Sequence, residues 1–139
     1  MLLSQTSEYA LRAVLYIAGR DGPARAAEIA DAAGVPPNYM SKTLHQLVRA
    51  GVLLSTRGPS GGFRLAVAAR QLTLETVVAS FAARGERRCL LGLGVCGTVP
   101  DCAVHARWTP VAATVDEFFS RTTVATLLSH RSNTPEVNP

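Results

Sequence analysis

The stretch from Val35 to Ala66 decides the fold, and it reads VPPNYMSKTLHQLVRAGVLLSTRGPSGGFRLA. Its first half is expected to form a helix that begins at Pro36–Pro37 and ends at Gly51. A proline is tolerated in the first turn because its missing N–H would make no helical hydrogen bond there. Apolar residues recur at helical spacing on one side of it: Met40, Leu44, Leu47 and Val48. Its second half holds two apolar runs, 52–56 and 62–66, around a tip rich in glycine and proline, which predicts a β-hairpin.

Amphipathic helices are predicted on both sides of this stretch. Upstream, apolar residues at helical spacing predict helices over residues 5–20 and about 25–33. The predicted buried face of the first of these consists of Leu11, Val14, Leu15 and Ala18. Downstream, Thr73 is a good N-cap for a fourth helix. The order helix, helix, turn, helix, hairpin is that of a winged helix-turn-helix, so the predicted fold is mainly α with a small β-hairpin wing.

The chain divides into four predicted segments. Residues 1–82 form the winged helix-turn-helix domain, 83–104 a glycine-rich loop with all the cysteines, 105–130 a long helix and a short one, and 131–139 a tail expected to be disordered. The long helix, from about 105 to 121, carries a wide apolar stripe, which needs a partner surface. The stripe consists of Trp108, Val111, Ala112, Val115, Phe118 and Phe119.

Positive charge is concentrated around the predicted third helix and hairpin. The chain has a formal charge of +4 and a pI of about 9.4, which favours acidic partners such as nucleic acid. No acidic residue lies between Asp31 and Glu75. In a winged helix the third helix enters the major groove of DNA and the hairpin tip reaches an adjacent groove. The candidate DNA contacts are Asn38, Tyr39, Ser41, Lys42 and His45 on the helix, and Arg57, Gly58, Ser60 and Gly61 in the wing. The alternatives are a merely solvated helix face and a protein-interaction module of the same fold.

The three cysteines Cys89, Cys96 and Cys102 have the spacing C-x6-C-x5-C. Thiolates in a glycine-rich loop can converge on one metal centre, and cysteine ligation favours an iron–sulfur cluster or zinc. An odd number of cysteines, no signal peptide and no apolar run long enough to span a membrane predict a cytoplasmic protein without structural disulfides. The alternatives are three unrelated thiols, a zinc-stabilised module, a regulator that senses oxidants through its thiols, and a thiol enzyme. The chain has no CxxC pair and no substrate-cleft pattern, so enzymatic activity is not expected.

Several of these motifs resemble the IscR/NsrR/CymR family of bacterial winged-helix (Rrf-type) transcription regulators. Residues Ser7–Ala18 resemble the first helix of the family, Val35–Lys42 the start of its recognition helix, and Ala50–Leu53 with Arg57–Ala66 its wing. The resemblance runs over nearly all of residues 1–129. It implies a homodimer, paired through the long helix within 105–130, from about 105 to 121, that binds a roughly palindromic operator in double-stranded DNA and has no small-molecule substrate.

The cysteines resemble those of the iron–sulfur members of this family, which carry three in the corresponding loop. This implies that Cys89, Cys96 and Cys102 hold an iron–sulfur cluster, with 2Fe-2S favoured over 4Fe-4S. The fourth ligand is left open: His105 resembles the histidine ligand of IscR-like members, and Glu8 occupies the position of a carboxylate ligand in NsrR-like members. The implied function is a transcription regulator, a repressor, whose cluster senses redox state, nitric oxide or iron–sulfur status. The alternative is a cluster-free thiol-based or zinc-bound regulator of the same fold.

Overall fold

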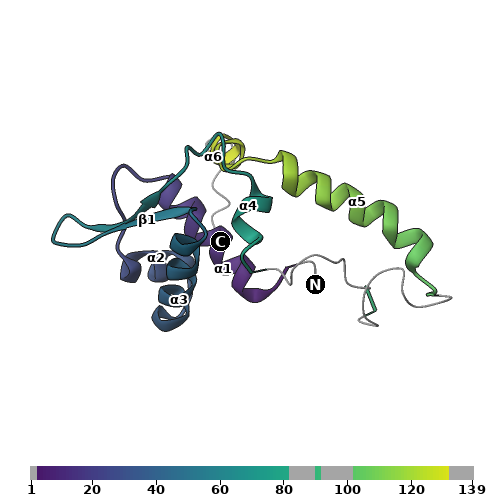
Figure 1. The fold of residues 1–139 in the computed structure, drawn as a ribbon, viewed down its shortest axis with the longest axis horizontal. Helices are drawn as coiled ribbons and strands as arrows, with labels where there is room; N and C mark the ends of the chain where they lie inside the picture. Colours follow the sequence, from purple (N-terminus) through teal and green to yellow (C-terminus); the bar gives the residue numbers. More distant parts are fainter. Residues whose placement is uncertain (1–2, 82–89, 92–101, 132–139) are drawn as a thin grey trace, which may run out of the picture.

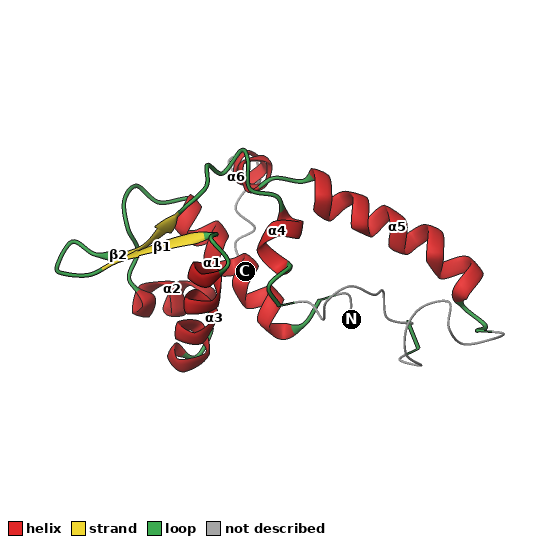
Figure 2. Cartoon of the chain, viewed as in Figure 1, coloured by secondary structure: helices red, strands yellow, loops and turns green. Residues whose placement is uncertain are grey.

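A computed structural model describes residues 3–81, 90–91 and 102–131 of the chain (Figures 1 and 2). Helices and a hairpin follow one another in the predicted order, so the prediction of a mainly α fold with a small β wing is confirmed. The elements are α1 (Gln5–Ala18), α2 (Ala26–Ala33), α3 (Pro37–Arg49), β1 (Leu53–Thr56), β2 (Gly62–Leu65), α4 (Leu74–Val78), α5 (His105–Arg121) and α6 (Val124–Arg131). No helix within these described ranges is both long enough and apolar enough to span a membrane.

Helix α1 is the centre of the core. The Ser4 hydroxyl caps it by accepting a hydrogen bond from the Ser7 backbone N–H at 3.1 Å. Its buried face consists of Ser7, Ala10, Ala13, Val14 and Ile17. The predicted face was therefore wrong in phase: of the four residues expected inside, Val14 alone is fully buried, and the other three lie partly buried at its edge. The small alanines face inward because α2, α3, α4 and α6 all pack closely against α1.

The turn between α2 and α3 sets the angle of the helix-turn-helix. Gly34 ends α2 in the left-handed conformation with φ of 67°, which glycine adopts without a steric cost. Pro37 then occupies the first turn of α3, as predicted. The buried residues of α3 are Met40, Thr43, Leu44 and Leu47, and Val48 is partly buried beside them. One face of α3 is therefore held in the core, and the opposite face is left at the surface.

Strands β1 and β2 form the antiparallel hairpin of the wing, in which Leu53 pairs with Leu65 and Thr56 with Gly62. Leu53 and Phe63 are buried at its base. Backbone hydrogen bonds of 2.9 and 2.7 Å join Ala24 to Phe63, so the segment before α2 adds a short third pairing to the wing. The base of the wing is thereby fixed to the helical body.

Helix α5 projects from the body on the side opposite the wing (Figure 1). It packs against α4, and its Ala112 is buried. Phe119 packs against the core, whereas Val111 and Phe118 of the predicted apolar stripe are 50% and 52% exposed. After α5, Val124 returns the chain to the core at the start of α6. Much of the apolar stripe is therefore not covered by the described part of this chain.

Candidate nucleic-acid interface and metal ligands

The outer face of α3 presents the predicted polar side chains to solvent. Asn38, Lys42 and His45 are exposed, and Tyr39 is 60% exposed although it is aromatic. Ser41 is half-buried at the edge of this face. The His45 ring meets Phe63 edge-on with 6.1 Å between centroids, so this side chain lies against the base of the wing. His45 thus joins the outer face of α3 to the base of the wing, and neither element carries an acidic residue.

The wing tip is a tight turn built on glycine. Gly58 has φ of 102° with open space around its α-carbon, and Arg57 and Ser60 are exposed beside it. Gly61 differs, because it is buried and a Cβ there would lie 2.2 Å from the Thr56 carbonyl oxygen. Its N–H already donates to the Gly58 carbonyl at 3.0 Å. The turn itself therefore requires glycine at 61, whereas Gly58 leaves an open approach to the backbone.

Arg25, the residue before α2, reaches the wing tip and was missed by the sequence analysis. Its guanidinium donates to the carbonyl oxygens of Gly58 at 3.2 Å and Pro59 at 2.6 Å. These partners are 33 and 34 residues away along the chain. No local pattern marks such a contact, so only the pairing of the segment before α2 with the wing reveals it.

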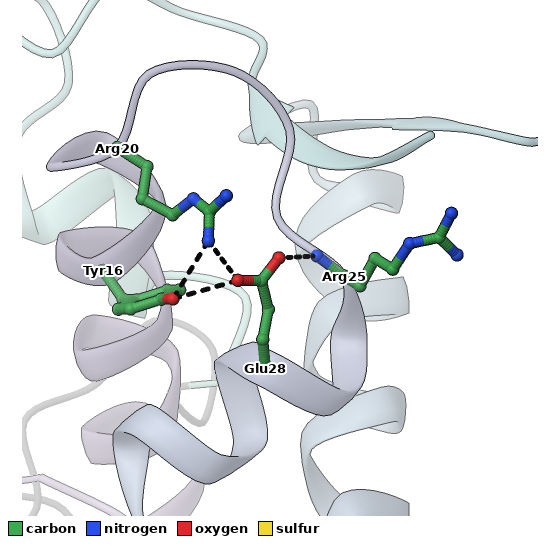
Figure 3. A network of polar contacts seen from close by, with 4 residues as sticks. All are labelled: Tyr16, Arg20, Arg25 and Glu28. Atoms are coloured by element: carbon green, nitrogen blue, oxygen red, sulfur yellow. Dashed lines mark hydrogen bonds and ion pairs between the residues drawn. The ribbon is translucent and has the colours of Figure 1, made fainter. Parts of the chain in front are cut away.

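A polar network fixes the backbone of Arg25 (Figure 3). The Glu28 carboxylate accepts the Arg25 backbone N–H at 2.7 Å and the Tyr16 hydroxyl at 3.1 Å, and it pairs with the Arg20 guanidinium. The pKa of Glu28 is lowered, most of all by the hydrogen bond from the Arg25 N–H, and further by the hydrogen bond from Tyr16 and the positive charge of Arg20. The network joins the end of α1 to the start of α2.

The predicted metal ligands are only partly described. Cys102 is half-buried, and His105 is half-buried one turn later at the start of α5, where its N–H donates to the Cys102 carbonyl at 3.2 Å. Glu8 is half-buried in the first turn of α1. Cys89 and Cys96 lie outside the described residues. Within the described part of the chain, no three His, Cys, Asp or Glu side chains gather as a metal site. A thiolate and an imidazole three residues apart are donors that suit an iron–sulfur cluster or zinc.

The fold and its surface are those of a winged-helix protein, and comparisons with known proteins give its family. Residues 3–130 match the Rrf2 model, described as an iron-dependent transcriptional regulator, so the chain belongs to the Rrf2 family. Its relatives and structural neighbours are transcription regulators, and the prediction that the chain is not an enzyme agrees with them.

Two relatives match over most of their length. A protein of Aquifex aeolicus, provisionally named an HTH-type transcriptional regulator, is 34% identical over 133 residues, which cover 93% of this chain and 92% of the relative. The HTH-type transcriptional regulator IscR of Vibrio parahaemolyticus is 28% identical over 131 residues, which cover 93% of this chain and 78% of IscR. This chain is thus similar in sequence to regulators of this kind over most of its length.

Two solved structures share the fold. CymR (YrzC), the global cysteine regulator of B. subtilis, superposes with a TM-score of 0.76 at 21% identity, covering 92% of this chain and 96% of CymR. IscR of T. potens superposes with a TM-score of 0.76 at 19% identity, covering 99% of this chain and 93% of IscR. At these identities the likeness extends to the fold alone, since one fold serves different sensors.

Proposed function

We propose that this Rrf2-family regulator represses transcription in the cytoplasm, and that an iron–sulfur cluster on its cysteines controls its affinity for operator DNA. The observation that carries the proposal is the position of Cys102 and His105 at the start of α5. The same helix exposes Val111 and Phe118 further along. His105 and the apolar stripe therefore share one helix, and Cys102 lies three residues before it, so a change at these two ligands is transmitted to whatever surface packs on the stripe.

The proposed DNA interface is the outer face of α3 together with the wing tip. Asn38, Lys42 and His45 enter the major groove, where asparagine pairs with adenine and lysine bonds guanine or phosphate. Arg57 enters the adjacent, electronegative minor groove. Tyr39, Ser41, Gly58 and Ser60 lie beside these residues and bind the phosphate backbone, whereas Gly61, whose N–H already donates to the Gly58 carbonyl, shapes the wing turn.

The proposed assembly is a homodimer that pairs through α5. The exposed Val111 and Phe118 are spaced seven residues apart, two helical turns, so they lie on one side of the helix. Two-fold pairing places two copies of α3 on a roughly palindromic operator, with half-sites about 34–36 Å apart for one turn of DNA. A change in α5 then alters the spacing of the two recognition helices.

The proposed cluster ligands are Cys89, Cys96 and Cys102, with His105 favoured over Glu8 as the fourth. When bound, a 2Fe-2S cluster supplies iron that responds to oxidants, nitric oxide and iron supply. His105 is favoured because it follows Cys102 by three residues at the start of α5, whereas Glu8 lies on α1. The description of the matching family model as an iron-dependent regulator supports the cluster, and a cluster-free thiol-based or zinc-bound regulator of the same fold is the second candidate.

Anaerobic purification followed by visible absorption and by iron and acid-labile sulfide counts tests the cluster. Equal iron and sulfide in a coloured protein support the proposal, and two of each per chain support the 2Fe-2S type. Cys96→Ser is expected to remove the colour and leave a folded protein. A colourless wild type after anaerobic reconstitution contradicts the cluster and leaves the thiol-based or zinc-bound regulator.

Lys42→Ala and Arg57→Ala test the DNA interface. Each is expected to weaken operator binding, because each removes a groove or phosphate contact worth about 1–3 kcal/mol. Both side chains are exposed, so the circular dichroism spectrum and melting temperature should not change. Wild-type affinity in both variants overturns the interface.

A further inference from the structure

The wing tip has few contacts of its own with the body. Residues 54–60 are all exposed, and the hairpin extends away from the helices (Figure 1). The Ala24–Phe63 hydrogen bonds hold its base. Within the tip, the Gly61 N–H donates to the Gly58 carbonyl, which closes the turn but does not tie it to the body. The direction of the tip therefore depends on contacts beyond the hairpin.

Arg25 supplies such a contact. Its backbone is fixed twice: Ala24 before it pairs with Phe63, and its own N–H donates to Glu28. Its side chain extends away from the Glu28 network (Figure 3), and one guanidinium nitrogen donates to the Gly58 and Pro59 carbonyls. A residue anchored at the base of the wing thus reaches the tip.

The chemistry of this contact favours a fixed geometry. Hydrogen bonds from a guanidinium are about twice as strong as those between neutral groups. Two consecutive carbonyls on one nitrogen also define the orientation of the peptide between them, and Arg57 directly precedes that peptide. The two acceptors are neutral, so neither cancels the positive charge of Arg25.

We infer that Arg25 is a positioning residue for DNA binding: it holds the wing tip so that Arg57 is directed at the DNA before the complex forms. Binding then requires less ordering of the wing, and affinity rises because that entropic cost is already met. This inference rests on the proposed DNA interface. It assigns to Arg25 a function through Arg57 rather than a contact of its own with the DNA.

Arg25→Ala tests this role cleanly, since alanine keeps the backbone N–H that Glu28 binds. Operator affinity is expected to fall about tenfold. In a double-mutant cycle with Arg57→Ala, the two losses should be strongly non-additive, because Arg25 acts through Arg57. Hydrogen exchange at the Gly61 amide of the free protein should become faster. Arg121→Ala removes the same charge from the C-terminal end of α5 and serves as the control.

The salt dependence of binding separates positioning from direct contact. A residue that neutralises one phosphate contributes about 0.9 to the slope of log affinity against log salt. Positioning leaves the slope of Arg25→Ala at the wild-type value. A slope reduced by about 0.9 with additive losses overturns the inference in favour of a direct phosphate contact. Wild-type affinity in Arg25→Ala alone also overturns it, whereas wild-type affinity in Lys42→Ala and Arg57→Ala means that the proposed interface itself has failed.

Discussion

The wing and helix α5 both project from the helical body, to opposite sides in Figure 1, but their contacts differ. The wing is held by its own chain: Ala24 and Arg25 bind its base and tip, and Phe63 is buried beneath it. Helix α5 packs on α4 but leaves Val111 and Phe118 half-exposed. The difference indicates that one projection is completed within the chain, whereas the other leaves an apolar surface open for the proposed partner.

Breaking the partner surface of α5 is expected to have the largest effect. Phe118→Asp places a charge in the proposed dimer interface, and the protein should become a monomer in sedimentation equilibrium. Operator affinity should fall about a thousandfold, the low end of the gap between specific and non-specific binding. Glu117→Gln, on the exposed neighbouring position, should remain a dimer. A dimeric Phe118→Asp protein with wild-type affinity would place the interface elsewhere.

Breaking the internal packing of the wing is expected to have the next largest effect. Gly61→Ala forces a Cβ against the Thr56 backbone, so the turn must shift, at a cost of about 3 kcal/mol in the free energy of unfolding. In Gly58→Ala the new Cβ meets open space, so the only cost is that of the positive φ, about 1 kcal/mol in the free energy of unfolding. Urea denaturation measures both. Equal losses in the two variants would mean that φ, and not the close approach to Thr56, decides the wing turn.

The Glu28 network, which fixes the backbone of Arg25 beside the wing, should make the stability of the protein depend on pH. Because folding lowers the pKa of Glu28 from its ordinary value near 4.5, the network stabilises the protein above that value. This stabilisation is lost as the pH falls through the lower pKa of the folded state. Glu28→Gln should therefore lower stability at neutral pH and flatten its fall in acid, by less than the glycine effect, since exposed pairs contribute little. Parallel acid curves for wild type and variant would contradict this role.

The smallest expected effect lies on the outer surface of α5. The Arg121–Glu117 pair is 3.0 Å long, and the Arg121 side chain is 79% exposed. Arg121→Ala should change the free energy of unfolding by no more than about 0.5 kcal/mol, as for other exposed pairs four residues apart on a helix. Thermal melting at two salt concentrations checks this. A larger loss would mean that α5 depends on its own polar contacts as well as on the proposed partner.

The elements themselves could be predicted because their signals are local. Helical spacing, the prolines at 36–37 and the glycines at 34 and 51 act within a few residues, and the observed bounds of α3 and of the wing follow them closely. The absence of acidic residues from α3 and the wing could also be predicted, because charged residues can be counted directly from the sequence. The cysteine spacing predicts ligands, but two of the three cysteines lie outside the described residues, so the ligand set stays a prediction.

Tertiary packing decided what local patterns leave open. It turned the alanines of α1 inward and Leu11 and Leu15 to the edge, because neighbouring helices approach most closely where side chains are small. It placed Arg25 on carbonyls 33 and 34 residues away, and it made Gly61 a requirement of the turn. The sequence by itself determined the elements and the chemistry of their surfaces, because those depend on near neighbours. Which face is buried, and which distant residue holds the wing, depended on contacts that exist only once the chain has folded.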